Sequence, residues 1–500
     1  MISRSLAITL TCLLTFACAE SNPPRSDAGA GADGMATSDA GGSGAGGGGA
    51  AGDAAGQGEL ADPDGPRFWL RSFGGAWRDE LRDVSVNPSG DAWLLGTTES
   101  AGAGSWDAWL LRVDACGQPV AGWTLGGAGK DAGVALGRLS SGDLVVVGDT
   151  ESFESALEVF VTRITPTGQL AWSAAVGGPG WDAAVDVTVT SDDGVVVLGE
   201  TYNFGPGAPK THNLLVFSLD SGGKLRWEQT LGGGVDGDAG FGLLREQDDG
   251  VVIVGATESY GNGRDDVWLL RLDPTGKLLW ARTYGGEEDD EGRAIAPDGS
   301  GGYWLSGFSR GWDAIKSDAF LLHVDGNGDP LRLTRYGDAG KERGYALLPD
   351  AGGLTMLGVT DSIDGYDDGY ALRLDADGEV VWMKRIGSDK YDDVRAATAI
   401  PAKPGDMLWV GATESYGNGG REAWYGRIRA DGEGGCKVRP VETPWERRSV
   451  KLPVAGKTLP EVAHGAVRRS VALKVSPMPA APTLDGDLRC VSPACPKDLD

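Results

Sequence analysis

Seven acidic residues recur through the chain and are the first candidates for chemistry. Each follows a Gly pair, or a remnant of one, by a few residues: Asp79, Asp131, Asp182, Asp238, Asp290, Glu342 and Asp392. A ring of carboxylates could bind a ligand, but Ca²⁺ needs six or more converging oxygens and a seven-fold ring is wide. Asp in a turn also accepts backbone N–H bonds locally. We interpret the seven as turn residues first and as a candidate binding ring second, and expect no metal site or cofactor beyond weak Ca²⁺ binding.

Hydroxyl groups recur with the same rhythm. Five Thr-x-Ser elements occupy residues 98–100, 150–152, 257–259, 360–362 and 413–415, and Tyr260, Tyr366 and Tyr416 follow in Gly-rich loops. A surface rich in acid, hydroxyl and tyrosine could recognise a saccharide or a peptide. Turn chemistry copied by duplication explains the same pattern, and we favour that interpretation.

Three motifs resemble active-site or metal sequences without their context. The segment "GFSRG" (307–311) matches a nucleophile elbow, but that motif needs a strand–turn–helix, and here it replaces a repeated turn. His212, His323 and His464 have no ligand spacing. "DGNGD" (325–329) begins like a calcium loop, but Pro330 and Tyr336 stand where Gly and Glu are required, so we predict an ordinary turn.

The elements that position these residues follow from an internal repeat. "VGATESYGNG" occurs at 254–263 and again, unchanged, at 410–419, while the Gly markers, which start at 74, 126, 177, 232, 285, 337 and 387, are 50 to 55 residues apart. Each unit holds four short runs of β-formers bounded by Gly, Asp or Asn, as in residues 171–220. Four strands in such a unit are typical of a propeller blade. The sequence predicts an all-β, seven-bladed β-propeller over residues 67–436.

Runs such as "DDVWLLRLDPTGKLLW" (265–280) and "WARTYGGEEDDEGRAIAPDGSGGYWLSG" (280–307) resemble the seven-bladed β-propeller (SBBP-type) repeats of secreted bacterial proteins. The resemblance covers roughly residues 68–436 and implies an extracytoplasmic, non-enzymatic module. Fold does not imply function, so it identifies no ligand.

The N-terminus predicts export. An apolar run from Leu6 to Ala17 is too short to span a bilayer, and "LLTFAC" resembles a lipobox with Cys18 as the lipidated residue. Residues 19–66 are rich in Gly, Ala, Ser and Asp, which predicts a disordered linker. We favour a lipid-anchored protein of the cell envelope, at the outer membrane and facing outward. Cleavage after Ala19, which would release a soluble protein, is the alternative.

Charge limits the partners. The chain carries 72 acidic and 45 basic residues, for a net charge of −27. We expect no nucleic-acid partner, because this surface would repel phosphates, and we expect a monomer. Residues 437–500 form a basic tail with eleven Lys or Arg against seven Asp or Glu, so the tail could lie on the acidic body.

Aromatic residues and cysteines predict how the ring is packed and closed. Trp69, Trp172, Trp227, Trp280 and Trp382 each lie five residues before a Gly marker, and Trp109, Trp268 and Trp424 share another repeat position; we interpret both sets as packing between blades rather than as a sugar-binding ladder. Residues 68–73 supply the strand that blade seven lacks, pairing with 424–428. With Cys12 and Cys18 in the signal segment, oxidation would pair Cys116 with Cys436 and Cys490 with Cys495. In the alternative, residues 437–441 form the outer strand and Cys436 pairs with a tail cysteine.

We therefore predict a tethered propeller that binds an unidentified saccharide or protein through its loop-rich, acidic face. The alternative is a carbohydrate-active enzyme, which would need two carboxylates unrelated by the repeat. No catalytic residue is assigned. Residues that break the pattern, which a catalytic site would need, are His212 in blade three and Arg310 and Lys316 in blade five.

Overall fold

The computed structural model describes residues 69–449 and four short tail segments, 461–463, 467–470, 474–477 and 490–491. The gaps are 154–155, 179, 203, 208–210, 234–236, 312–313, 315, 364, 417–419, 435–436 and 442–444. The chain divides into two units, Met1–Gly65 and Pro66–Asp500, and the described residues all belong to the second. The predicted signal segment, the lipidation of Cys18, the linker and the residues His464, Cys436 and Cys495 lie outside the described residues and stay predictions.

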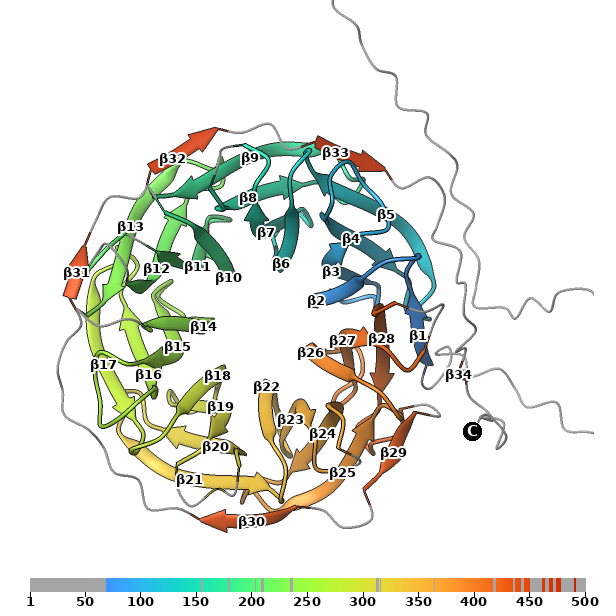
Figure 1. Cartoon of the computed structure of the whole chain (residues 1–500), viewed down its shortest axis with the longest axis vertical. Helices are drawn as coiled ribbons and strands as arrows, with labels where there is room; N and C mark the ends of the chain where they lie inside the picture. Colours follow the sequence, from blue (N-terminus) through green and yellow to red (C-terminus); the bar gives the residue numbers. More distant parts are fainter. Residues whose placement is uncertain are drawn as a thin grey trace, which may run out of the picture. The chain divides into compact units, whose positions relative to one another are not determined.

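Seven sheets surround one axis, as Figure 1 shows, so the predicted seven-bladed propeller is confirmed. From the axis outward, blades one to three are built from the following strands: β2 (Asp79–Val86), β3 (Ala92–Thr98), β4 (Asp107–Val113) and β5 (Pro119–Gly126); β6 (Asp131–Arg138), β7 (Leu144–Thr150), β8 (Glu158–Ile164) and β9 (Leu170–Gly177); β10 (Asp182–Val189), β11 (Val195–Tyr202), β12 (His212–Leu219) and β13 (Leu225–Gly232).

Blades four to seven repeat this order. Their strands are β14 (Ala239–Arg245), β15 (Val251–Thr257), β16 (Asp266–Leu272) and β17 (Leu278–Tyr284); β18 (Asp290–Pro297), β19 (Tyr303–Ser309), β20 (Asp318–Val324) and β21 (Pro330–Gly337); β22 (Glu342–Asp350), β23 (Gly353–Thr360), β24 (Asp368–Leu374) and β25 (Val380–Ile386); and β26 (Asp392–Ala399), β27 (Met407–Thr413), β28 (Glu422–Ile428) and β1 (Trp69–Phe73). We call the four positions of a blade strands A, B, C and D.

The burial of the strands explains their sequences. The strand B and C segments, such as Val251–Thr257, are buried along almost their whole length because both faces of each sheet pack against neighbouring blades. The sequences of these strands are therefore continuous apolar runs, without the alternation of apolar and polar residues that a half-exposed strand has. Each strand A contains a β-bulge two residues after its first acidic position, as between Ala184 and Asp186. A bulge increases the local twist where the strands line the axis.

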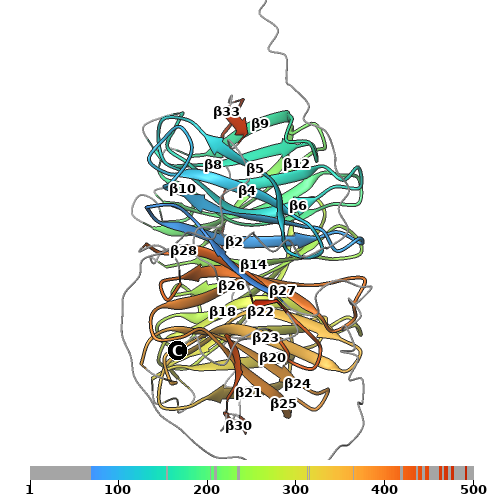
Figure 2. The same ribbon diagram turned by 90° about the vertical axis from the view of Figure 1, so that its right-hand side faces the viewer.

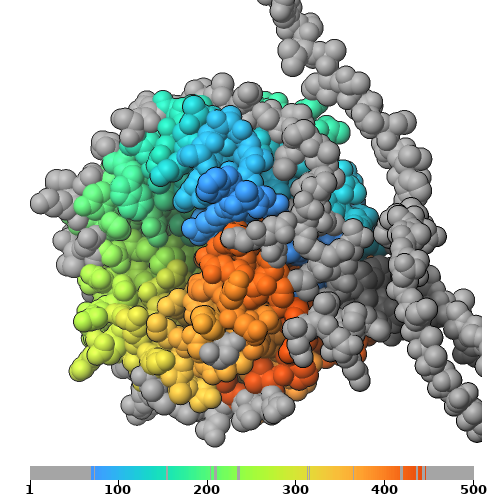
Figure 3. All heavy atoms as spheres, turned by 45° about the vertical axis from the view of Figure 1, so that its right-hand side comes forward, coloured from blue at the N-terminus to red at the C-terminus, as the bar shows by residue number. Residues whose placement is uncertain are grey.

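The ring closes as predicted. The N-terminal strand β1 pairs with β28 of blade seven in an antiparallel register that joins Leu70 to Gly426 and Ser72 to Trp424. In Figure 3 the blue strands of blade one contact the orange strands of blade seven. The alternative, in which residues 437–441 complete blade seven, is wrong because β29 (Val438–Pro440) pairs with β25 of blade six.

Six described strands of the basic tail lie around the outside of the propeller, and we call them the belt. Each adds a fifth, antiparallel strand to the outer edge of a blade, and the belt visits blades six, five, three, two, one and seven in turn. Within the described residues, β17 of blade four carries no fifth strand. Besides β29, the members of the belt are β30 (Glu446–Ser449), β31 (Glu461–Ala463), β32 (Val467–Ser470), β33 (Lys474–Pro477) and β34 (Cys490–Val491). Figure 1 shows the belt strands at the periphery, and β33 and β30 lie at opposite ends of the disc in Figure 2. The belt covers sheet edges that would otherwise offer unpaired backbone groups.

The repeated tryptophans pack between blades, which confirms the structural interpretation. Trp172 on strand D of blade two donates its indole N–H to Ser221 O in the next blade at 3.0 Å. Its ring covers Gly223, where a Cβ would lie 2.7 Å from the indole and φ is +79°. Only glycine fits at that approach with that backbone conformation. Trp69 packs in the same way on Gly117, across the closure of the ring.

Candidate functional site

The seven repeated carboxylates lie inside the blades, not on the channel surface, and all are fully buried. Asp131 shows the arrangement. It accepts hydrogen bonds from Thr150 Oγ1 at 2.5 Å, from Ser152 Oγ at 2.6 Å and from the Gly127 N–H at 2.7 Å. The Gly marker, the acid and the Thr-x-Ser element thus form one unit, which we call a node. In blade two, the acid and the hydroxyls therefore bond to one another within the blade, as the turn interpretation predicts.

Two nodes depart from the pattern in instructive ways. In blade five, Ser309 of the "GFSRG" segment is a buried residue of β19 and the cross-strand partner of Asp290, so it has a structural role. In blade three, Phe204 takes the place of the node Ser and contacts Gly178.

The "DGNGD" segment forms the turn before β21. Asp325 accepts hydrogen bonds there from the backbone N–H groups of Asn327 and Asp329, as predicted for an ordinary turn.

A second row of polar residues near the start of strand C was missed by the sequence reading. In blade one it supplies Asp107, and a Cβ added to Gly126 would lie 2.3 Å from Asp107 Oδ1 and 2.7 Å from Asp131 Oδ2. The marker glycine is therefore held between two carboxylates. The signal was the recurring acid before the strand C apolar run. The full row is Asp107, Glu158, Asn213, Asp266, Asp318, Asp368 and Glu422.

Burial of these acids shifts their titration. Burial raises the pKa of Asp290 to about 7, and nearby Asp266 adds to the effect. Burial also raises the pKa of Asp266 and of Glu342, to about 6 and about 7. A desolvated carboxyl favours its neutral form, which can donate as well as accept.

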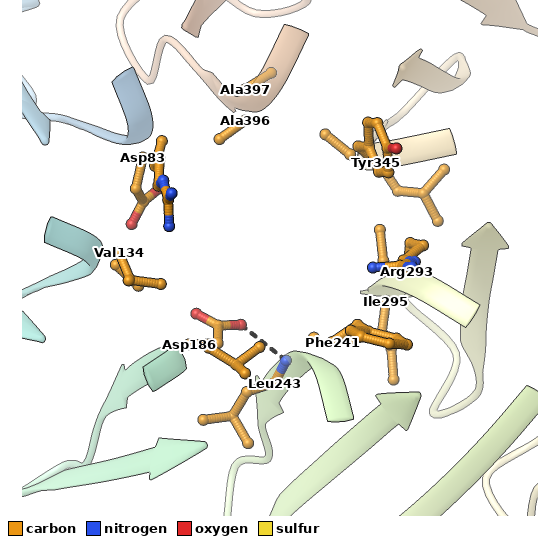
Figure 4. Close-up of a pocket in the computed structure, with 17 residues that line it drawn as sticks. Asp83, Val134, Asp186, Phe241, Leu243, Arg293, Ile295, Tyr345, Ala396 and Ala397 are labelled. Carbon is orange, nitrogen blue, oxygen red and sulfur yellow. Dashed lines mark hydrogen bonds between the residues drawn. The ribbon is translucent and has the colours of Figure 1, made fainter. Parts of the chain in front are cut away.

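The central channel contains a cavity of about 230 Å³ lined by the seven A strands (Figure 4). Asp83 and Asp186 lie on its wall, but each accepts a backbone N–H from the next blade, Leu136 N at 2.7 Å and Leu243 N at 2.9 Å. These two acids therefore clamp neighbouring blades. The cavity is smaller than the roughly 300–1,000 Å³ of typical small-molecule sites, so the chemistry of the face above it is the better candidate.

This face carries the D–A turns and the B–C loops of the blades. In each blade it has three positions whose residue type differs from blade to blade, and we call these positions the rim. Backbone hydrogen bonds define them: Tyr202 N donates to Trp181 O at 3.0 Å, and Asp238 N donates to His212 O at 3.4 Å. Before the node acids lie Arg78, Lys130, Trp181, Gly237, Asp289, Lys341 and Tyr391. After the node hydroxyls lie Glu99, Glu151, Tyr202, Glu258, Arg310, Asp361 and Glu414. The third position is the residue whose carbonyl accepts the N–H of the node acid in the next blade. These residues are Trp106, Leu157, His212, Asp265, Ser317, Asp367 and Arg421.

In blades seven and one, two acids beside the rim, Glu80 and Asp393, are neutralised by arginines. Glu80 pairs with Arg78 and Arg82, each at 2.8 Å. Burial alone would raise the pKa of Glu80, but the two guanidinium groups lower it to about 2. Asp393 pairs with Arg395 at 2.8 Å and with Arg421. We call this the paired sector.

Blades two to four differ, and we call them the acidic sector. Among the described residues, Glu200 and Asp265 form no ion pair within the 4.0 Å that defines one, and Asp149 has no ion pair either but accepts the Ala184 N–H of the next blade at 2.7 Å. Burial raises the pKa of Asp149 to about 6, and it raises that of Glu200 as well. For Asp265, burial and the nearby acids Glu291, Glu258 and Asp289 raise the pKa to about 6. Negative charge is therefore concentrated and poorly compensated here.

An aromatic cluster stands beside these acids at all three rim positions of blade three. Trp181 stacks on Tyr202 with ring centroids 5.9 Å apart, and His212 meets both rings edge-on at 5.2 and 4.8 Å. All three side chains are partly exposed. His212 is thus a pattern-breaking residue as predicted, although it begins β12 rather than lying within the loop.

The other predicted site residues do not join this cluster. Arg310 pairs with Asp289 in blade five, and Lys316 is exposed in the same B–C loop. His323 contacts Asp298 at 2.9 Å and stacks on Trp304, away from the rim. Tyr260 donates to Gly232 O at 2.8 Å. The described part of the chain contains no group of three potential metal ligands, and weak Ca²⁺ binding stays a prediction. No helix of the described residues is long and apolar enough to cross a membrane.

The predicted disulfides are only partly visible. Cys116 is buried and disulfide-bonded in the turn before β5. Because Cys436 and Cys495 lie outside the described residues, the pairings Cys116 with Cys436 and Cys490 with Cys495 stay predictions.

The seven sheets around one axis define the protein as a seven-bladed β-propeller. Comparison with known proteins does not identify a family within that class. No family model matches the chain. Regulatory protein FlaEY of Caulobacter vibrioides is 25% identical over an alignment of 228 residues, and the match covers 37% of this chain but only 23% of that protein's length. Sqt1 of Chaetomium thermophilum covers 68% of this chain and 82% of its own, with a TM-score of 0.42 and 13% identity. Puromycin hydrolase covers 67% and 50%, with a TM-score of 0.41 and 17% identity.

Proposed function

We propose that the protein is a non-enzymatic binding module whose rim recognises a basic segment of a protein partner. The observation that carries the proposal is the difference between the two sectors of the rim. Arginines neutralise Glu80 and Asp393 in the paired sector, whereas Glu200 and Asp265 of the acidic sector form no such pairs with any residue that the structure describes. A cationic partner would supply the missing compensation, and opposite charge would also speed its association.

Two further features support recognition rather than catalysis. At Asp131 the repeated carboxylate and hydroxyls are occupied by node hydrogen bonds. The channel cavity, at about 230 Å³, is small for an enclosed substrate. A partner held at the rim needs no deep pocket, because protein recognition relies on a surface with a few desolvated anchor residues.

The tether is a separate part of the proposal. The sequence "LLTFAC" and the Gly-rich residues 19–66 support a protein anchored through Cys18, with the propeller presented outward from the cell envelope. Mass spectrometry of the mature protein should find a lipid-modified Cys18 at its N-terminus. An unmodified N-terminus at Glu20 would replace the anchored protein with the secreted alternative.

Binding is tested with the purified protein against immobilised arginine-rich, lysine-rich, acidic and neutral peptides, together with neutral and acidic polysaccharides. We expect selective binding of the basic peptides, weakened by added salt because exposed charges are screened. Binding to polysaccharides in place of basic peptides would overturn the partner class. Turnover of any glycan would overturn the non-enzymatic assignment and favour the carbohydrate-active alternative.

A further inference from the structure

Three aromatic sites of the rim differ in what covers them. Trp106 carries Lys130 Nζ 5.5 Å from its ring centroid, and Tyr391 carries the guanidinium of Arg421 at 4.9 Å. These contacts are cation–π pairs, in which the ring face attracts a positive charge. The cluster in blade three is the third aromatic site, and among the described residues no cation lies over the ring of Trp181 or Tyr202.

The geometry of blade three brings a carboxylate to the same surface. Tyr202 and His212 are direct cross-strand partners, and Glu200 lies two residues before Tyr202. Residues two apart on a strand point to the same face. Leu198 continues this face and packs in one cluster with Ile253 of blade four, so the cluster stands at the upper end of the seam between blades three and four.

Blade four presents a glycine to this seam. Gly240 of strand A faces blade three, where an added Cβ would lie 2.8 Å from Leu198 Cδ1. Above this contact Trp181, Tyr202, His212 and Glu200 all stay partly exposed. The aromatic faces and Glu200 are therefore within reach of a partner's side chain.

We infer that Trp181, Tyr202, His212 and Glu200 form a subsite for the guanidinium group of an arginine in the partner. This inference rests on the proposed function and specifies its anchor. The planar guanidinium can stack on an aromatic face while its N–H groups meet a carboxylate, which the compact lysine ammonium does less well. Arg421, which lies over Tyr391 while pairing with Asp393, is an example of this arrangement inside the same rim.

The test compares binding of an arginine-rich and a lysine-rich peptide of equal length. The wild type should prefer the arginine peptide. Trp181→Ala should lower its affinity about tenfold and remove the preference, because a partly desolvated cation–π contact contributes roughly 1–2 kcal/mol. Trp106→Ala is the matched control, since that ring already holds Lys130, and it should change affinity less than twofold.

Glu200→Gln provides a second variant that keeps the shape of the side chain. It should weaken both peptides several-fold, and the thermal unfolding of each variant shows whether the fold is retained. Unchanged arginine binding in Trp181→Ala and Glu200→Gln would overturn the subsite while leaving rim recognition of basic partners intact. Failure of the wild type to bind either peptide would instead overturn the proposed function itself.

Discussion

The node carboxylates and the rim carboxylates are the same chemical group in two different settings. Asp238 of a node is fully buried and accepts bonds from Thr257, Ser259 and the Gly233 N–H. Asp265, at the rim of the same blade, has other acids around it and no ion pair among the described residues. The first type recurs in every blade and the second in only some. In this propeller, repetition marks the scaffold, and departure from repetition marks the surface available for recognition.

The largest expected effect comes from breaking a node. Asp238→Ala leaves two hydroxyls and a buried N–H without their acceptor, so we expect a loss of about 3 kcal/mol in the free energy of unfolding. Asp265→Ala should change stability by less than about 0.5 kcal/mol, because it removes only repulsion and burial cost. Urea denaturation of both variants measures the difference. Equal losses would show that the nodes are not the scaffold we describe.

The pH dependence of stability should separate the same two settings. Asp290 and Glu342 have folded pKa values raised to about 7, so their contribution is full below their unfolded values and is lost as the pH rises through 7. Glu80 has its pKa lowered to about 2, so its contribution is present above its unfolded value and is lost as the pH falls toward 2. Stability should therefore be greatest in mildly acidic solution.

Asp290→Asn tests this directly, because it removes one titrating group while keeping its shape. Between about pH 5 and about pH 8 the wild type should lose stability, with about 2 kcal/mol of the loss due to Asp290. The variant should show a flatter profile of melting temperature against pH. Asp325→Asn, in an exposed turn, is the control and should leave the slope unchanged. A wild-type stability that rises over this range would contradict the assigned burial.

The scaffold was largely predictable from the sequence because the same pattern of four strands recurs in seven successive units. The period indicated the blades, and the missing outer strand of blade seven indicated closure by residues 68–73, of which β1 (Trp69–Phe73) pairs with β28. The node was seen only as separate pieces, since nothing in the sequence joins Asp131 to Ser152, 21 positions away. The strand C acids were visible as a repeat but were read as part of an apolar run.

The belt and the rim could not be predicted in the same way. Belt strands have two to four residues and no period, and they pair through backbone groups that any extended segment can offer. The aromatic cluster joins Trp181, in the turn before β10, with Tyr202 and His212, on either side of the following B–C loop. The only sequence signal was that His212 breaks the repeat, which identified the blade but not its aromatic neighbours.

The smallest expected effect tests whether arginines alone distinguish the two sectors of the rim. Arg421 pairs with Asp393 and covers Tyr391, so Arg421→Gln should expose both a carboxylate and an aromatic face in the paired sector. We expect a basic peptide to bind about threefold more tightly, since a partly exposed ion pair of this kind contributes up to about 1 kcal/mol. Arg264→Gln is the control, because Arg264 is exposed and its Nη1 lies 3.9 Å from Asp289 Oδ1, near the outer limit of an ion pair. If Arg421→Gln binds the peptide no better than this control, the aromatic cluster of blade three, rather than the missing arginines, sets the acidic sector apart.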